Sequence, residues 1–219
     1  MSLAWPEPLE KRVASGGLIA VLTVDDAGDA VPLARALLDG GVDAMELTLR
    51  TPVALEALRR IVAEVPEMGA GVGTILTPDQ ADAAKAAGAA FGVSPGVNPR
   101  VLARCAEIGL PFAPGIVTPS DIEAALEHGC RILKFFPCEP SGGLPYLTSM
   151  VAPYRHLGVR FIPLGGVGPA NLATYLDHPD ILAVGGSWLA KPAVIEQRDW
   201  PAVTTAAREA REIAAKARP

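Results

Sequence analysis

Several signals that would place a chain on nucleic acid or in a membrane are missing from these 219 residues. The net charge is −5, from 19 Lys and Arg against 24 Asp and Glu, and no basic run occurs; nucleic-acid binders and polybasic membrane-surface proteins carry the opposite signature. No apolar stretch approaches the ~18 to 20 residues of a membrane span. Residues 1–17 hold too many Pro and charged side chains for a signal peptide. We therefore expect a cytoplasmic protein with no nucleic-acid and no membrane partner.

Cysteine is scarce, and aromatic residues make up only 5% of the chain. Cys105, Cys130 and Cys138 are odd in number and lack a C-x-x-C spacing, so neither a disulfide framework nor a thiolate zinc site is indicated. We expect reduced thiols, with Cys138 acting as a small apolar filler near a strand end.

Motifs for dinucleotides, for phosphate-binding P-loops and for HExxH zinc sites are absent from the sequence. The three histidines, His128, His156 and His178, share no ligand spacing. Each lies toward the C-terminus of a predicted helix, where a positive side chain meets the negative end of the helix dipole. We expect surface caps there and no metal site.

One unit returns along the chain: an Ala-rich helical segment, a Gly, and a short apolar run that ends in Gly or Pro. Leu33–Asp39 leads through Gly40 into Ala44–Thr48 in this way, and a Gly just past a helical pattern predicts a C-cap. Four helix starts pair an N-cap residue with Pro, a residue suited to the first helical position: Thr51-Pro52, Thr77-Pro78, Asn98-Pro99 and Thr118-Pro119.

Eight candidate strands alternate with these helices, which predicts parallel strands in an α/β fold. They are Leu18–Leu22, Ala44–Leu49, Gly71–Thr74, Phe91–Ser94, Pro111–Gly115, Ile132–Pro137, Arg160–Leu164 and Ile181–Gly185. Further helices are expected around Val13 and over Trp200–Ala217, and no linker divides the chain. The sheet is then either open and doubly wound or closed into a barrel.

The second strand decides between these two architectures. Alternation places Glu46, Thr48 and Arg50 on one face, and Met45 and Leu47 on the other. An open sheet covered by helices on both faces excludes such polar residues, whereas a barrel accepts them at the inner, C-terminal mouth. We predict a (β/α)8 TIM barrel with an N-terminal flanking helix, formed as a single domain by residues 1–219.

Lys134 stands in the middle of a predicted strand, with Ile132 and Phe136 on the same face. Taken alone, such a lysine snorkels to a strand end or pairs with a buried carboxylate. In a barrel interior, a desolvated amine has a lowered pKa and becomes a nucleophile toward carbonyl groups. The context favours this second interpretation, a Schiff-base lysine.

Three polar residues lie at the predicted mouth near Lys134. Glu46 and Arg50 either form a buried salt bridge or act separately, Glu46 moving protons and Arg50 binding a carboxylate. Thr74 ends the third strand as a hydroxyl donor or as a solvated strand end. The residues alone leave both alternatives open.

Two glycine pairs close the last two strands, Gly165-Gly166 and Gly185-Gly186, the second followed by Ser187. Each pair alone could be a tight turn. Together they lie where barrel enzymes commonly bind phosphate with backbone N–H groups and a helix N-terminus.

Seven segments in order now resemble the class I 2-keto-3-deoxy-6-phosphogluconate (KDPG) and 4-hydroxy-2-oxoglutarate (KHG) aldolase family. They are Glu46–Thr51, Gly71–Thr74, Ser94–Gly96, Pro114-Gly115, Lys134–Pro137, Gly165-Gly166 and Gly185–Trp188. The resemblance, from about Val13 to Ala210, implies a homotrimeric lyase that splits a phosphorylated 2-keto acid into pyruvate and glyceraldehyde 3-phosphate. It implies no metal and no organic cofactor.

The resemblance also implies roles for residues that match the family's motifs. Lys134 is the Schiff-base lysine and Glu46 the general acid and base. The remaining positions bind substrate, with Arg50 and Thr74 on the pyruvate carboxylate, Pro95 and Phe136 as apolar walls, and Gly165, Gly166, Gly186 and Ser187 on the phosphate.

Leu164 departs from the phosphogluconate branch of the family, where we expect Thr before the glycine pair. The 2-keto-3-deoxy-6-phosphogalactonate and KHG aldolase activities therefore stay open as alternatives, and Leu164 either faces the substrate or packs against the helices. A non-catalytic or isomerising phosphosugar-binding barrel would keep the glycines but would not need Lys134 and Glu46 together. A metal-dependent aldolase would need a ligand cluster.

Overall fold

The computed structural model describes residues 3–218, with strands and helices alternating along the chain. The strands are β1 (Leu18–Leu22), β2 (Ala44–Thr48), β3 (Gly69–Gly73), β4 (Gly92–Val93), β5 (Phe112–Ala113), β6 (Gly115–Ile116), β7 (Ile132–Phe135), β8 (Arg160–Pro163) and β9 (Val184–Gly186). The α-helices are α1 (Glu7–Gly16), α2 (Ala30–Asp39), α3 (Ala54–Glu64), α4 (Pro78–Ala86), α5 (Pro99–Ile108), α6 (Pro119–Glu127), α7 (Gly143–Val151), α8 (Leu172–Leu176), α9 (Pro192–Glu196) and α10 (Trp200–Ala217). Short 3-10 helices are η1 (Ala27–Asp29), η2 (Glu139–Ser141), η3 (Ala152–Leu157) and η4 (Trp188–Ala190).

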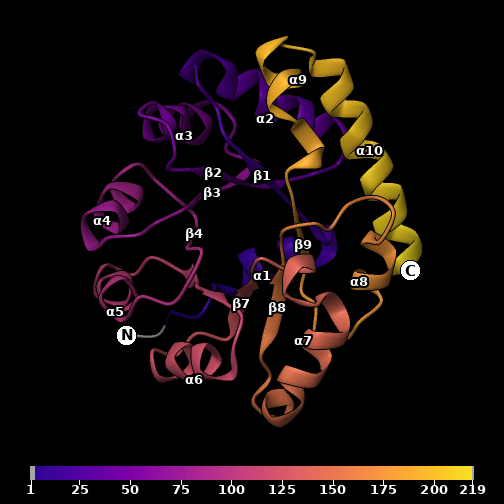
Figure 1. Ribbon diagram of the computed structural model, residues 1–219. Coiled ribbons are helices and arrows are strands. Elements are labelled where there is room, and N and C mark those ends of the chain that lie inside the picture. Colours follow the sequence, from indigo (N-terminus) through magenta and orange to yellow (C-terminus); the bar gives the residue numbers. More distant parts are fainter. Residues whose placement is uncertain (1–2, 219) are drawn as a thin grey trace.

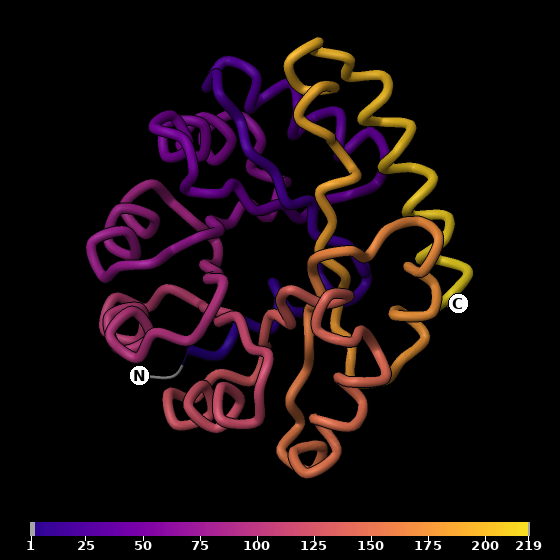
Figure 2. Tube along the Cα trace, in the orientation of Figure 1, coloured from indigo at the N-terminus to yellow at the C-terminus, as the bar shows by residue number. Residues whose placement is uncertain are grey.

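All named strand pairs are parallel, in a six-stranded sheet of order β5-β4-β3-β2-β1-β9 and a three-stranded sheet of order β6-β7-β8. The curled sheets lie inside a surround of helices (Figure 1). The chain passes from the first sheet to the second through Pro114, which splits the single strand predicted over Pro111–Gly115, because proline has no N–H to donate. Isolated bridges Phe161↔Ile181 and Leu164↔Gly185 join β8 to the segment of β9. β1 and β9 lie side by side although they are far apart in sequence (Figure 2).

The buried side chains form two groups that correspond to the two faces of the strands. Met45 and Leu47 belong to the larger group, which includes residues of the surrounding helices. Ala44, which alternates with them on β2, belongs to a smaller group with Ile132 and Ile162 from β7 and β8. The predicted division of the second strand into an inner and an outer face is confirmed.

Local capping sets the starts of three of the four helices predicted from N-cap and Pro pairs. Thr77 and Thr118 each form a capping box, with Gln80 and Asp121, and Asn98 accepts from the N–H of Arg100. The prediction for Thr51 is wrong. Its hydroxyl donates to the carbonyl of Val24 at 2.7 Å, and α3 begins at Ala54.

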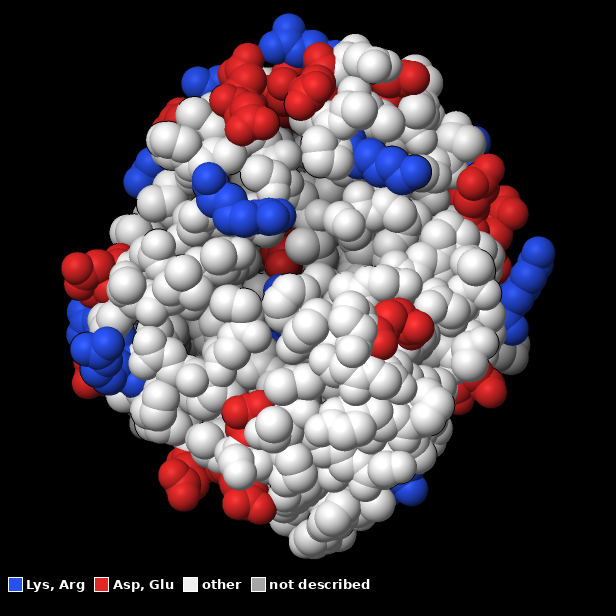
Figure 3. All heavy atoms as spheres, in the orientation of Figure 1, with Lys and Arg blue, Asp and Glu red and all other residues white. Residues whose placement is uncertain are grey.

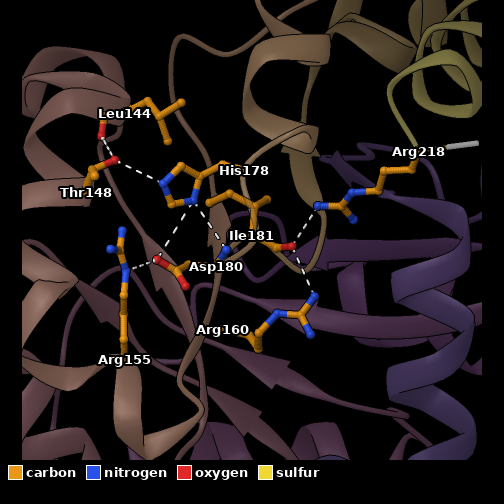
Figure 4. A network of polar contacts seen from close by, with 8 residues as sticks. All are labelled: Leu144, Thr148, Arg155, Arg160, His178, Asp180, Ile181 and Arg218. Atoms are coloured by element: carbon orange, nitrogen blue, oxygen red, sulfur yellow. Dashed lines mark hydrogen bonds and ion pairs between the residues drawn. The ribbon is translucent and has the colours of Figure 1, made fainter.

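His178 differs from the predicted surface cap, because its side chain is only 15% exposed. Its Nδ1 accepts from the N–H of Asp180 at 3.3 Å, and its Nε2 lies 3.2 Å from the hydroxyl of Thr148 (Figure 4). That hydroxyl donates to the carbonyl of Leu144, so it accepts from Nε2. The segment after α8 folds back on α7 and encloses this histidine. His128 caps α6, and His156 is exposed near the end of η3, both as expected.

The same view shows how the end of α10 is attached. Arg218 and Arg160, at the start of β8, both donate to the carbonyl of Ile181 (Figure 4). Arg218 also donates to the carbonyls of Leu176 and Leu182. These bonds hold α10 against the segment between α8 and β9. Within residues 3–218, no helix has the length and apolar character of a membrane span.

Candidate active site

Lys134 projects into the space enclosed by the strands. It lies on β7 in register with Gly115 of β6 and Ile162 of β8, and Ile132, two residues earlier, belongs to the inner group of buried side chains. Lys134 is only 7% exposed. Its Nζ lies 5.4 Å from the centroid of the Phe136 ring, within range of a cation–π contact.

Glu46 meets Lys134 across this interior. Lys134 Nζ donates to Glu46 Oε1 at 3.1 Å, although the two residues lie 88 positions apart in sequence. Glu46 is 2% exposed. A Cβ at Gly73 would lie 2.8 Å from Glu46 Oε1, so the glycine of β3 leaves room for the carboxylate. The arrangement places one amine and one carboxylate in direct contact with little water around them.

Arg50 does not pair with Glu46, and two hydroxyl groups hold its guanidinium instead. Nε donates to Thr48 Oγ1 at 3.0 Å, and Nη2 donates to Thr23 Oγ1 at 2.8 Å. The two hydroxyls are themselves 2.8 Å apart. Among residues 3–218 no carboxylate forms an ion pair with Arg50, so its charge is available to an anion. This excludes the salt bridge that the sequence left open.

Thr23 was not predicted from the sequence as a site residue. The available signal was its place directly after the strand Leu18–Leu22, where polar residues at the carboxyl ends of barrel strands commonly serve a site. Thr23 and Arg50 also border a cavity of about 480 Å³, whose lining includes Asp25, Asp26, Asp29 and residues of α9.

Thr74 directly follows β3 with a positive φ of 63°. This conformation costs a β-branched residue ~1–3 kcal/mol and is concentrated at functional sites. In the described part of the chain, no group accepts from or donates to its hydroxyl. Pro95 follows β4, is exposed, and its carbonyl approaches Gly115 so closely that a Cβ there would lie 2.2 Å from it.

The two predicted glycine pairs come together at the ends of β8 and β9. Gly165 and Gly166 adopt φ values of 103° and 86°, which L side chains rarely adopt. Gly186 ends β9 under the ring of Trp188, where a Cβ would lie 1.9 Å from a ring carbon. Ser187 is exposed at the start of η4. The bridge between Leu164 and Gly185 makes the pairs neighbours.

Leu164 has the inward parity of Ile162 on β8 and lies over Gly185, where a Cβ would approach its Cδ1 to 2.6 Å. Gly185 is in register with Ile19, a member of the inner group. Leu164 therefore faces the interior, and the alternative in which it packs against the helices does not hold.

The three cysteines are buried and free, and burial makes them poor nucleophiles. Burial raises the pKa of the Cys138 thiol to about 11 and the pKa values of Cys105 and Cys130 to about 12. Cys138 is more than a filler, because its thiol donates to the hydroxyl of Tyr175 at 3.1 Å. Residues 3–218 contain no group of three or more His, Cys, Asp or Glu side chains placed to hold a metal.

Known proteins match this chain over nearly its whole length. A family model described as KDPG and KHG aldolase matches residues 9–206. The 2-dehydro-3-deoxy-phosphogluconate aldolase of Treponema pallidum (strain Nichols) is 46% identical over 196 residues, which cover 90% of this chain and 92% of that protein.

Two crystal structures are similar to this one. The 2-keto-3-deoxy-6-phosphogluconate aldolase of Zymomonas mobilis ZM4 with 3-phosphoglycerate is 39% identical, with a TM-score of 0.84 over 92% of this chain and 94% of that one. The KDPG aldolase of Legionella pneumophila, with pyruvate captured at low pH as a covalent carbinolamine intermediate, is 34% identical. Its TM-score is 0.87 over 91% of this chain and 96% of that one.

Proposed function

The chain belongs to the KDPG and KHG aldolase family, and on that premise we propose that it cleaves 2-keto-3-deoxy-6-phosphogluconate into pyruvate and glyceraldehyde 3-phosphate. It does so as a class I aldolase, through a Schiff base on Lys134. The observation that carries the proposal is the contact of 3.1 Å between the buried Lys134 Nζ and Glu46 Oε1. A nucleophilic amine needs a base beside it, and this pair provides one.

The reaction begins when a proton passes from Lys134 to Glu46 and the neutral amine attacks C2 of the substrate. Glu46 then protonates the C2 hydroxyl of the carbinolamine, which leaves as water and gives an iminium. Next, Glu46 accepts the proton of the C4 hydroxyl while the C3–C4 bond breaks, and the electron pair of that bond flows into the iminium. The aldehyde leaves, and Glu46 gives its proton to C3 of the enamine, which becomes an iminium again. Water adds to this iminium at C2, and its hydrolysis releases pyruvate and restores the amine of Lys134.

Arg50 and Thr74 bind the pyruvate carboxylate in this proposal. The support is the orientation of Arg50 by Thr23 and Thr48, which holds the guanidinium without neutralising it. A charge-assisted bond to a carboxylate is about twice as strong as a neutral one. Pro95 and Phe136 form apolar walls around the pyruvyl group.

Gly165, Gly166, Gly186 and Ser187 bind the phosphate. Backbone N–H groups of glycines at strand ends can surround an anion without long basic side chains, which suits a chain of net charge −5.

At its carboxyl-end face the molecule is hollowed near the centre, with acidic and basic atoms visible at the bottom of the hollow (Figure 3).

We further propose that residues 1–219 form one domain and that the two sheets act together as a (β/α)8 TIM barrel. The continuity of β5 and β6 around Pro114 and the bridges between β8 and the segment of β9 support this closure. The proposed homotrimer rests on the family resemblance alone. The proposed cytoplasmic location is supported by the free, buried thiols. No metal and no organic cofactor takes part in the proposed reaction.

A second substrate is favoured by one observation, the inward position of Leu164. Its apolar side chain cannot read a substrate hydroxyl, so the galactonate epimer and 4-hydroxy-2-oxoglutarate remain candidate substrates. Coupled assays of pyruvate release from all three compounds test the proposal. We expect cleavage in each, fastest for the phosphogluconate, and none in Lys134→Ala; a wild-type protein that cleaves none of them contradicts the proposed function.

A further inference from the structure

Tyr175 on α8 lies between the loops that follow β7 and β8. It is 2% exposed. Its hydroxyl donates to Glu139 Oε1 and accepts from the thiol of Cys138 at 3.1 Å. Burial and these two partners raise the pKa of Tyr175, so the hydroxyl stays protonated and remains a donor to the carboxylate. The proposed reaction makes no use of this group.

The backbone of Glu139 is hydrogen-bonded to the proposed phosphate site. Its N–H donates to the carbonyl of Gly165 at 2.9 Å, and the N–H of Cys138 donates to the carbonyl of Leu164 at 2.9 Å. A Cβ at Gly166 would lie 2.6 Å from the Cβ of Glu139. The side chain of Glu139 therefore starts beside Gly166, one of the glycines proposed to bind phosphate.

Glu139 is also the residue whose charge works against that site. Glu139 is exposed, and in the described part of the chain no Lys, Arg or His forms an ion pair with it. A free carboxylate there repels a phosphate dianion. In the structure the carboxylate points instead toward Tyr175 and Gly143, whose Cβ would lie 3.2 Å from both Glu139 Oε1 and the Tyr175 hydroxyl.

We propose that Tyr175 is a positioning residue that holds the Glu139 carboxylate against α8 and thereby keeps competing negative charge away from the phosphate of the substrate. This inference rests on the proposed function. It predicts an effect confined to phosphorylated substrates, because the pyruvyl half reacts at Lys134 and Glu46, which are buried in the interior, whereas Glu139 is exposed.

The test compares 2-keto-3-deoxy-6-phosphogluconate with 2-keto-3-deoxygluconate, which has the same carbon chain without the phosphate. In Tyr175→Phe we expect kcat/KM for the phosphorylated substrate to fall by roughly 5- to 20-fold through KM, because the released Glu139 carboxylate can approach the phosphate and repel it at short range. The value for the unphosphorylated substrate stays unchanged. The double variant Tyr175→Phe, Glu139→Gln should restore kcat/KM for the phosphorylated substrate, because it removes the negative charge of Glu139.

Tyr154→Phe is the matched control, because Tyr154 also donates to a glutamate, Glu123, at 2.8 Å, but on the outer helices. This variant should leave kcat/KM unchanged for both substrates. An equal fall for both substrates, no fall, or a selective fall that persists in the double variant overturns the inference. A wild-type protein without aldolase activity overturns the proposed function itself, so the two failures are distinguishable.

Discussion

A single buried contact, between Lys134 and Glu46, accounts for most of the chemistry at the scale of residues. An unpaired charge at either position would be costly, because both side chains are almost fully removed from water. In the ion pair the two charges offset each other, and moving one proton along the 3.1 Å contact makes it a neutral amine beside a carboxylic acid. The same contact thus serves the resting protein and the first step of the reaction.

Replacing Glu46 with Gln should separate proton transfer from binding. Gln can still accept from Lys134, but it cannot carry a proton between steps. We expect kcat for cleavage to fall by about 10²- to 10⁴-fold, the usual contribution of a general acid or base. Pyruvate binding, measured by calorimetry, should change little; a loss of binding as large as the loss of kcat would contradict the role.

Leu164 should weaken discrimination between the gluconate and galactonate epimers. A site that bonds a substrate hydroxyl discriminates strongly, whereas an apolar wall supplies only ~1–3 kcal/mol. We expect Leu164→Thr to raise the ratio of kcat/KM values for the two epimers. Leu164→Val is the control, since Val has the shape of Thr without its hydroxyl. An equal ratio in the wild type and both variants would show that this residue does not set specificity.

At the scale of elements, local capping sets the starts of α4 and α6, the helices that follow β3 and β6 in the chain. Thr77 and Thr118 each bond the N–H three residues later. Thr77→Ala and Thr118→Ala should each lower the free energy of unfolding by about 1 kcal/mol. Thr205→Ala is the control, because the Thr205 hydroxyl donates to the carbonyl of Pro201 within α10 and does not cap a helix start; a loss there as large as at the caps would contradict the assignment.

Elements governed by neighbouring residues could be predicted from the sequence. The strand Leu18–Leu22 matches β1 in full, and the starts of α4, α5 and α6 follow from local caps. Thr51 failed because its hydroxyl bonds Val24, 27 positions earlier in the chain. Such long-range partners leave no local pattern.

The candidate site divides in the same way. Alternation along a strand places Lys134 and Glu46 inside, so their direction could be predicted. Their pairing, 88 positions apart, could not. Tyr175 was missed for the same reason, because it acts through Glu139 on another element. Thr23 did carry a local signal, its place directly after the strand Leu18–Leu22.

For the whole molecule, the thiols report how completely the core is closed. The pKa values of all three cysteines are raised by burial, from 9.0 to about 11 for Cys138 and about 12 for the others. The thiolate is therefore scarce at pH 8, and it forms only as the pH rises toward those values. We expect the folded protein to react with Ellman's reagent far more slowly than the protein in guanidinium. A thiol that reacts equally fast in both states would contradict the closed core.

In the whole molecule, the strands bring groups from most of the chain together around Lys134. The central claim is that Lys134 forms a Schiff base with the substrate. Incubation with pyruvate and borohydride, followed by peptide mass mapping, tests this claim most directly. The account predicts one pyruvate adduct, on Lys134, that is lost in Lys134→Ala and in samples without pyruvate. No adduct, or an adduct on another lysine, would contradict it.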